Sequence, residues 1–355
     1  MIKSYCIPLI LTKNRTIDSI MANFSIIICT YNPEIRIIKR CLSAIQKLEE
    51  NGFSYEVIIV ENNCSAPLSN ADELNEILKK FDKLKIIAEP LPGLSNARIA
   101  GVHSAGSPWL VFFDDDNEPD SDYLVSLLPL VSKYPNVGIW GPGNVTVDFV
   151  DKTTKWIDEN CRDTFQEKHF TDIEYAMQEA WNRCYPPGSG ICIRRDVFLK
   201  YIELYKSRNF KTTGRTGASL ISAEDNQIIN TSILLGFAVG TCPDLKLNHL
   251  IPAVKSNFSY IKRLRFFIRY SVPLAQVEFF PEQMQKYKDE QRSQLSLFTQ
   301  LTKYLITGFF KGKLKEAMIN CILISGNFTG INLVLNKRNP YWLILFLNCI
   351  GIKLK

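Results

Sequence analysis

The sequence predicts an α/β fold, in which helices flank a doubly wound, mostly parallel sheet and a helical C-terminal extension follows. Two observations support this prediction. Between residues 24 and 143, short apolar runs alternate with segments whose apolar residues recur at helical spacing, which is the pattern of successive β-α units. The short runs are apolar throughout, which indicates strands that are buried on both faces, as in parallel sheets.

The first part of the chain supplies these elements in order. Residues 24–29 predict a strand, and Pro33 then begins a helix that Asn51-Gly52 stops. Further strands are predicted at 55–60, 84–88, 109–113 and 137–140, and helices at 72–81 and 93–105. In such a sheet, ligands bind at the carboxyl ends of the strands.

The rest of the chain divides into a mixed part and a helical part. A Pro- and Gly-rich loop at 186–190 leads into a strand at 191–193, and helices at 196–205 and 224–235 precede a strand at 237–241. Residues 258–355 are predicted to be helical. We therefore expect an N-terminal arm at 1–20, a main domain at 21–257 with halves at 21–143 and 144–257, and a C-terminal region at 258–355.

Composition limits the classes of function. The chain has 355 residues, and 46% of them are hydrophobic, which is enough for a large core. Its ten cysteines form no CxxC pair, so we expect neither a zinc ribbon nor a thioredoxin-like site. Scattered cysteines of this kind predict a reducing, cytoplasmic location. Residues 258–355 carry 15 basic and 5 acidic side chains, whereas residues 1–257 carry 27 and 31. A basic tail behind a mildly acidic front predicts two different roles.

The most informative motif is Asp114-Asp115-Asp116, which directly follows the apolar run at 109–113. Clustered carboxylates beside a buried strand are costly unless a cation offsets them, and a divalent metal prefers such oxygen ligands. Taken alone, the motif fits a solvated turn after a strand equally well. Polar clusters also follow the first two strands, at 30–32 and 61–63, and all three are expected at one sheet edge. The chain has neither GxxxxGK[ST] nor GxGxxG after its first strand, so P-loop and dinucleotide sites are poorly supported.

These motifs resemble those of the family 2 glycosyltransferases, over roughly residues 24–250. The resemblance rests on residues 25–33 (SIIICTYNP), 60–65 (VENNCS), 92–98 (PGLSNAR), 113–116 (FDDD), 188–195 (GSGICIRR) and 224–225 (ED). It implies an inverting enzyme of the GT-A fold that transfers a sugar from a nucleotide-diphosphate sugar with Mn²⁺ or Mg²⁺. Residues 21–143 would then bind the nucleotide sugar, and residues 144–257 the acceptor.

The resemblance also implies roles for individual residues. Asp225 matches the general base, with Glu224 beside it. Asp116, Asp114 and His249 are the candidate metal ligands. Tyr31 and Glu61 match positions that contact the nucleobase, although the family more often has Asp where this chain has Glu61. The remaining candidates for donor binding are Thr30, Asn32, Asn63, Arg98, Asp115 and Gly190.

Two other functions stay open at this point. A sugar nucleotidyltransferase also uses aspartate-bound magnesium, but it would carry a Gly-rich basic loop after its first strand. A non-catalytic sugar-nucleotide-binding protein on the same fold would not need Asp114, Asp116 and Asp225. The chain lacks the QxxRW motif of processive synthases. We therefore expect the addition of a single sugar to a saccharide or lipid-linked saccharide, in surface polysaccharide or glycolipid assembly, with no nucleic-acid partner.

The C-terminal region predicts peripheral contact with the inner face of the cell membrane. On a helix over residues 261–270, apolar side chains including Ile261 and Leu264 share one face, and Lys262, Arg265 and Arg269 share another. Such a helix can lie among lipid headgroups. The alternative is that these helices pack on the main domain or form a homodimer interface.

Overall fold

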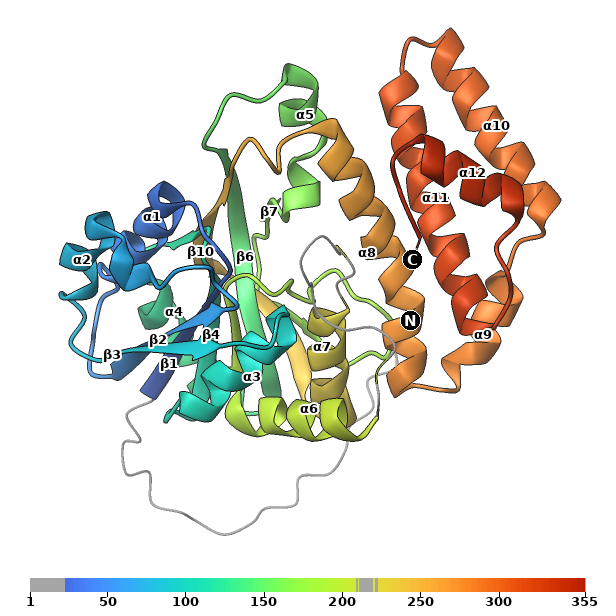
Figure 1. The fold of residues 1–355 in the computed structure, drawn as a ribbon. Helices are drawn as coiled ribbons and strands as arrows, with labels where there is room; N and C mark the ends of the chain where they lie inside the picture. The colour runs from blue at the N-terminus through green and yellow to red at the C-terminus, as the bar shows by residue number, and fades with distance from the viewer. Residues whose placement is uncertain (1–22, 209, 211–219, 221–222, 355) are drawn as a thin grey trace.

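The structure, a computed structural model, describes residues 23–208, 210, 220 and 223–354 (Figure 1). The predicted arm at residues 1–20 lies outside the described residues. The strands are β1 (Asn23–Thr30), β2 (Ser54–Asn62), β3 (Leu84–Glu89), β4 (Trp109–Asp114), β5 (Asn117–Pro119), β6 (Val137–Phe149), β7 (Lys168–His169), β8 (Glu174–Ala176), β9 (Ile191–Arg194) and β10 (Ala238–Ile251). They join in one sheet of order β3-β2-β1-β4-β9-β6-β10-β5, with β7 beside β6 and β8 beside β10.

Helices cover the sheet and continue into the C-terminal region. Those of the first part are α1 (Ile35–Ile45), α2 (Asp72–Leu78), α3 (Leu94–Ser104), α4 (Tyr123–Lys133), α5 (Lys155–Asn160), α6 (Arg195–Ser207) and α7 (Glu224–Leu234), with 3₁₀ turns at Leu68–Asn70 and Arg162–Phe165. Those of the C-terminal region are α8 (Phe258–Phe279), α9 (Gln283–Glu290), α10 (Gln294–Phe310), α11 (Leu314–Val334) and α12 (Tyr341–Cys349).

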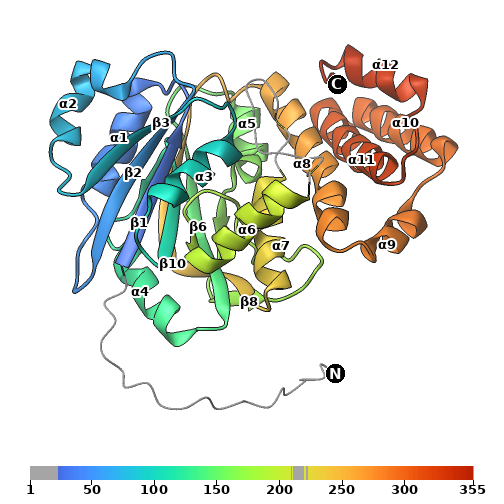
Figure 2. The ribbon, with the colours of Figure 1, turned by 60° about the horizontal axis from the view of Figure 1, so that its bottom comes forward.

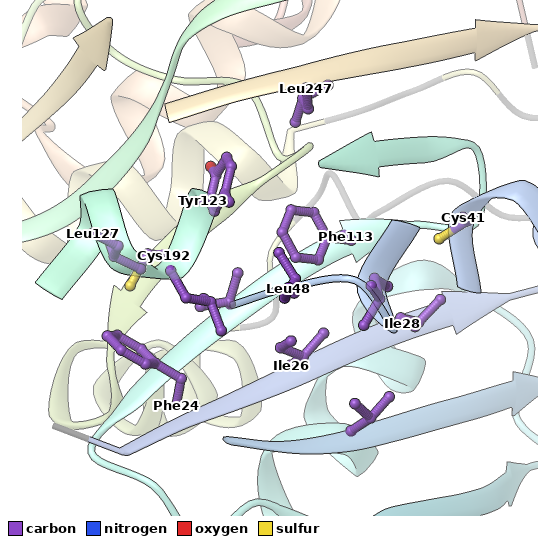
Figure 3. Close-up of a cluster of buried hydrophobic side chains, with 14 of the residues drawn as sticks. Phe24, Ile26, Ile28, Cys41, Leu48, Phe113, Tyr123, Leu127, Cys192 and Leu247 are labelled. Carbon is purple, nitrogen blue, oxygen red and sulfur yellow. The ribbon is translucent and has the colours of Figure 1, made fainter. Parts of the chain in front are cut away.

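The central strands are buried on both faces, as their apolar runs predict. Successive side chains of a strand point to opposite sides of the sheet. Phe24, Ile26 and Ile28 of β1 therefore share one hydrophobic cluster with α1, α2 and α4 (Figure 3), whereas Ile27 shares another with α3, α6 and α7. Each fully buried side chain of this size contributes about 1.5–3 kcal/mol. The edge strand β3 is the exception, because Ile86 is exposed there.

The doubly wound, mostly parallel sheet is confirmed, with one reversed strand inside it. Strands β1 to β4 in the order β3-β2-β1-β4 are parallel, and so are β6 and β10. Between these two groups lies β9, which is antiparallel to both of its neighbours. The apolar pattern of residues 191–193 predicts a strand but carries no information about its direction.

The C-terminal helices form a layer at one side of the molecule, beyond the helices that cover the sheet (Figures 1 and 2). A third hydrophobic cluster joins Val147 and Phe165 of the main domain to residues of α8, α10, α11 and α12. This core crosses residue 257, so α8 is packed against the main domain. The division of the chain at residue 257 remains a prediction.

The helix expected at 261–270 is present within α8, but its apolar face is only partly exposed, with Ile268 at 40%, and its contact with a membrane remains a prediction. Ile261 and Leu264 are buried in the third cluster, so they are not available to lipid. Lys262 donates to the Ile350 carbonyl at 2.7 Å, and Arg265 pairs with Asp163 at 2.6 Å. Helical spacing identified the amphipathic segment correctly, but tertiary packing uses most of its apolar face internally.

Helix α11 is the one helix of the described residues that is long and apolar enough to cross a membrane. Of its most apolar window, 61% is buried inside the protein. It packs on α8 at Gly326 and Gly330, where a Cβ would lie 2.6 and 2.4 Å from the carbonyl oxygens of Phe266 and Tyr270. These contacts are those of a core helix.

Candidate active site

The carboxyl ends of β1, β2 and β4 border a cavity of about 350 Å³. The C-terminal part of β10 and the start of α8 form another part of its wall. Nine predicted site residues line it: Thr30, Tyr31, Asn63, Arg98, Asp114, Asp115, Asp116, Asp225 and His249. Four predicted site residues, Asn32, Glu61, Gly190 and Glu224, are not among the residues that line the cavity. The expected convergence of three strand ends is therefore present.

Asparagines at the ends of β1 and β2 shape two loops that border the cavity. Asn32 and Asn63 have φ of 45° and 52°, a left-handed conformation that asparagine tolerates better than most residues. The Asn32 side chain accepts hydrogen bonds from the backbone N–H and the hydroxyl of Ser65, at 2.8 and 2.9 Å. Asn32 thus joins the two loops, and Tyr31, which is 55% exposed, lines the cavity beside it.

Glu61 and Asn62 fix the neighbouring backbone. The buried carboxylate of Glu61 accepts a hydrogen bond from the Leu68 N–H. Asn62 donates to the carbonyls of Glu89 and Leu91, and its oxygen accepts from the Gly93 N–H at 2.8 Å. Glu61 is thus committed to the protein's own backbone in this structure, and its role toward a nucleobase remains a prediction.

The three consecutive aspartates of the acid cluster have three different sets of partners. Asp114 accepts from the Ser189 hydroxyl at 2.7 Å, and Asp115 accepts from Thr30 at 2.5 Å. Asp116 is nearly buried and pairs with Lys255 Nζ at 2.6 Å, while His249 Nε2 lies 3.5 Å from its other oxygen. Because each carboxylate is held separately, the cluster can coexist with the hydrophobic end of β4.

Electrostatics separates Asp115 from Asp116. Burial and the adjacent negative charge of Asp116 raise the pKa of Asp115 to about 7. Burial acts in the same direction on Asp116, but the positive charges of Lys255 and His249 hold the pKa of Asp116 well below its usual range. Asp116 is therefore the carboxylate that stays ionised at neutral pH and the stronger candidate for a cation ligand.

Arg98 connects the acid cluster to the acidic pair at the start of α7. Its guanidinium lies 2.8 Å from Asp225, 3.6 Å from Glu224 and 3.9 Å from Asp114. The side chain is only 3% exposed and packs over the Phe112 ring. Burial would lower the pKa of Arg98, but the three carboxylates raise it. One fixed positive charge thus positions three acids from two distant parts of the chain.

The two acids at the start of α7 have different surroundings. Asp225 lines the cavity, and its side chain is 27% exposed. Glu224 is buried, and burial raises its pKa to about 7, although Arg98 acts in the opposite direction. The structure therefore offers Asp225 to a ligand and places Glu224 behind it, beside Arg98.

The glycines of the loop before β9 permit a close approach to this cluster. A Cβ at Gly188 would lie 2.4 Å from the Asp225 carboxylate and 2.5 Å from the Arg98 guanidinium. Gly190 has a φ of +68°, and its carbonyl accepts from the Tyr123 hydroxyl. Gly190 therefore shapes the loop, and the contact with the cavity is made by Gly188 and Ser189.

The sequence profile of glycosyl transferase family 2 matches residues 25–202, which is half of the chain and includes β1, β2, β4 and β9. The chain belongs to this family. Within this family 2 protein, the matched region ends before α7, so the profile does not test the acidic pair at 224–225, and the role of this pair remains a prediction. The sheet and its helices agree with the GT-A fold that the resemblance implied.

Two curated relatives match part of this family 2 protein. The glycosyltransferase EpsH of Bacillus subtilis is 27% identical over 167 residues, which cover 45% of this chain and 46% of EpsH. An inactive polypeptide N-acetylgalactosaminyltransferase-like protein 5 of Mus musculus is 30% identical over 115 residues, which cover 31% and 26% of the two chains. The alignments thus span half or less of each relative.

Solved structures resemble the chain at low sequence identity. S. aureus TarS 1–349 in complex with UDP-GlcNAc has a TM-score of 0.47 and 12% identity, and the match covers 90% of this chain and 93% of TarS. GalNAc-T7 with UDP, GalNAc and Mn²⁺ has a TM-score of 0.49 and 14% identity, and the match covers 72% and 51% of the two chains.

The residues at the acid cluster fit a divalent cation with two protein ligands. His249 Nδ1 donates to the Phe165 carbonyl at 2.8 Å, which directs Nε2 toward Asp116. A histidine oriented in this way is common among metal ligands. Within the described residues, no three His, Cys, Asp or Glu side chains gather as a metal site. Asp114 is directed to Ser189, so Asp116 and His249 are the pair that would hold the ion, together with donor oxygens.

Sequence reasoning missed several residues of the cavity wall. Lys255 pairs with Asp116, and Ser189 holds Asp114. Gln166, which has a φ of 74°, also lines the cavity. Lys255 and Gln166 lie between elements and belong to no motif, whereas Ser189 lies in the motif at 188–195 but was not named as a site residue. One available signal was the spacing from His249 to Lys255, six residues further along the chain.

Proposed function

We propose that the protein is an inverting glycosyltransferase that moves one sugar from a nucleotide-diphosphate sugar to an acceptor hydroxyl. The observation that carries this proposal is the cavity of a family 2 chain in which Arg98 joins Asp114 of the acid cluster to Asp225. The cavity volume, about 350 Å³, suits a small ligand. Its polar lining at the strand ends suits the phosphates and ribose of a nucleotide.

In this proposal, Asp225 acts as the general base. Its carboxylate removes the proton of the acceptor hydroxyl while the acceptor oxygen bonds to the anomeric carbon and the bond to the diphosphate oxygen breaks. Arg98, whose side chain is buried, holds Asp225 in place through a hydrogen bond of 2.8 Å. Asp116 and His249 would hold Mn²⁺ or Mg²⁺, which neutralises charge on the nucleoside diphosphate. Tyr31, which lines the cavity and is exposed, is available to contact the base.

The proposal extends to the acceptor of the sugar and to the location of the enzyme in the cell. We propose a single addition to a saccharide or lipid-linked saccharide during surface polysaccharide or glycolipid assembly, by a cytoplasmic enzyme at the inner membrane face. The nine cysteines of the described residues are free thiols, which supports a reducing compartment. The basic C-terminal region supports contact with anionic lipid, and a homodimer through the same region is the alternative.

A panel of nucleotide sugars with Mn²⁺ tests the function directly. We expect one or a few donors to raise the melting temperature and to be hydrolysed slowly without an acceptor. Asp116→Ala should abolish both effects, whereas Asp120→Ala, at an exposed position near the cluster, should keep them. Full activity in excess chelator would contradict the metal dependence. Donor binding without any hydrolysis or transfer would favour a non-catalytic binding protein, for which the inactive mouse relative is a precedent.

A further inference from the structure

Lys255 occupies a position that the proposed reaction has not used. It follows β10, three residues before α8 begins, and its Nζ lies 2.6 Å from Asp116 Oδ2. Its side chain is 33% exposed, while that of Asp116 is 7% exposed. The lysine therefore extends from a partly exposed position to a carboxylate that is almost fully buried.

The charges that line the cavity make this contact significant. Asp114, Asp115, Asp116 and Asp225 all face the cavity, and a nucleoside diphosphate would bring further negative charge. Among the described lining residues, Arg98 and Lys255 are the two that carry a permanent positive charge. Arg98 is buried, donates a hydrogen bond to Asp225 and is ion-paired with Glu224, so it has little freedom to follow a ligand.

Lys255 has that freedom. Its ammonium group sits at the end of a flexible four-carbon chain, and its three donors can be reoriented without a fixed plane. Its side chain donates to Asp116, which is also the best candidate to bind a divalent cation. A cation held by Asp116 Oδ1 and His249 Nε2 would stand beside the ammonium of Lys255 on Oδ2 of the same carboxylate. The two positive charges repel each other and share one negative charge, so loading the site favours release of the lysine.

We propose that Lys255 is an exchangeable cation of the donor site, which neutralises Asp116 in the free protein and moves to the donor's diphosphate when Asp116 binds the metal. The exchange keeps a positive charge beside Asp116 and beside the diphosphate, and the charges of the divalent cation and the diphosphate offset each other. It would also place a positive charge where the leaving diphosphate gains negative charge. This inference rests on the proposed nucleotide-diphosphate donor and deepens it.

The exchange predicts two opposite effects of one substitution. Lys255→Met keeps the length of the side chain and removes its charge. Mn²⁺ alone, titrated by electron paramagnetic resonance, should bind roughly 10-fold more tightly, because about 1.4 kcal/mol of ion pairing no longer opposes it. UDP or GDP in saturating Mn²⁺, titrated by calorimetry, should bind about 10-fold more weakly, since a charge-assisted contact is lost.

Two variants control for a merely structural role. Lys246→Met removes an exposed lysine from β10, the strand that precedes Lys255, and should change neither the Mn²⁺ affinity nor the nucleotide affinity. Lys255→Arg keeps the positive charge and should retain nucleotide binding. If Lys255 only stabilised the turn before α8, Lys255→Met would lower the melting temperature and weaken both ligands together.

The outcomes separate this inference from the proposed function. If the wild-type protein binds UDP or GDP and Lys255→Met binds both Mn²⁺ and nucleotide unchanged, the exchange is wrong and the proposed function stands. If the wild-type protein binds no nucleoside diphosphate in Mn²⁺, the proposed donor is wrong, and the diphosphate contact of Lys255 fails with it. Weaker binding of both ligands also overturns the exchange.

Discussion

At the scale of single residues, a small number of positively charged side chains holds a larger number of carboxylates in place. Arg98 contacts Asp225 at 2.8 Å and also approaches Glu224 and Asp114. Removing one carboxylate therefore changes the charge around the others. Substitutions at these positions are informative only when they preserve shape, and the amide analogues of aspartate and glutamate do so.

Asp225→Asn tests the general base. The variant keeps the size of the side chain and a hydrogen-bonding oxygen for Arg98 but cannot accept the acceptor's proton. We expect nucleotide-sugar affinity to stay within a few-fold of wild type and the transfer rate to fall by roughly 10²–10⁴-fold. Calorimetry with the donor and a transfer assay measure the two quantities separately. A loss of donor affinity equal to the loss of rate would make Asp225 a binding residue.

Glu224 predicts a dependence of stability on pH. Its pKa is raised from 4.5 to about 7 in the folded protein, so the folded state holds a proton that the unfolded state releases between these values. The wild-type free energy of unfolding should therefore decrease as pH rises from 4.5 to 7 and then level off. Glu224→Gln should remove the part of this decrease that Glu224 causes and be more stable at pH 8, by up to about 3 kcal/mol. Asp115, whose pKa is also raised to about 7, keeps its own part of the decrease in both proteins.

Urea unfolding at pH 5 and pH 8 measures this effect. Glu76→Gln, at an exposed position on α2, is the matched control and should leave the slope unchanged. Identical pH slopes for wild type and Glu224→Gln would show that the glutamate is not titrating in this range. In that case, its ion pair with Arg98 would outweigh the cost of burial.

The strand-end residues of the site could be predicted from the sequence, and the residues between elements could not. Asp114 to Asp116 directly follow an apolar run, so their position at the sheet edge needs no tertiary information. Ser189 reaches Asp114 because β9 pairs with β4. Lys255 reaches Asp116 because β10 pairs with β5, which directly follows the acid cluster. Glu61 lies at the end of β2, as its sequence pattern predicted. Its side chain, however, accepts a hydrogen bond from the Leu68 N–H of the following loop.

At the scale of elements, prediction succeeded where apolar periodicity was complete and failed where glycine and proline interrupt it. The strand predicted at 137–140 continues to Phe149 through Gly141-Pro142-Gly143. A Cβ at Gly141 would lie 2.2 Å from Pro186, and one at Gly143 would lie 2.6 Å from the Cys242 carbonyl. These glycines allow close packing within the sheet, which a propensity argument interprets as a turn. Helix α4 was missed, and it contains Pro129.

The contact between α8 and α11 supports a prediction about stability. At Gly330 an added Cβ would meet the Tyr270 backbone at 2.4 Å, and backbone cannot rotate away as a side chain can. Gly330→Ala should therefore force the helices apart and cost about 1–3 kcal/mol of unfolding free energy, despite the better helix propensity of alanine. Asn327→Ala, on an exposed position of α11, should be neutral or slightly stabilising. Equal melting temperatures for the two variants would contradict the tight contact.

At the scale of the whole molecule, charge and exposed apolar surface gather in the C-terminal region. Residues 291–355 contain nine basic side chains and one acidic side chain, Glu316, which accepts from the Trp156 indole. Most of the apolar face of α8 is buried, and among the described residues of this helix Ile268 is the one large apolar side chain that is exposed, at 40%. We therefore expect the membrane contact on a larger exposed surface. Helix α10 provides one, which we call the α10 stripe: Leu295, Phe298, Ile306, Phe309 and Phe310, all at least 50% exposed.

The α10 stripe has the properties of a helix that lies on a bilayer. Its members fall on one side of α10, opposite the buried Leu297, Leu301 and Gly308. Bulky apolar residues flanked by lysines, such as Lys303 and Lys311, match the interface of an anionic membrane. Each basic residue near the surface contributes about 1 kcal/mol. We therefore expect the protein to sediment with vesicles that contain anionic lipid, and less so as salt is raised.

Phe309→Ser with Phe310→Ser tests the stripe itself. Because these rings are 70% and 82% exposed, their loss should leave the melting temperature and donor affinity unchanged while reducing vesicle binding about 10-fold or more. Leu199→Ser, at an exposed apolar position on α6, is the matched control and should bind vesicles like wild type. If wild type instead forms a dimer that the double variant converts to a monomer, and neither protein binds vesicles, the α10 stripe is a contact between two copies of the chain.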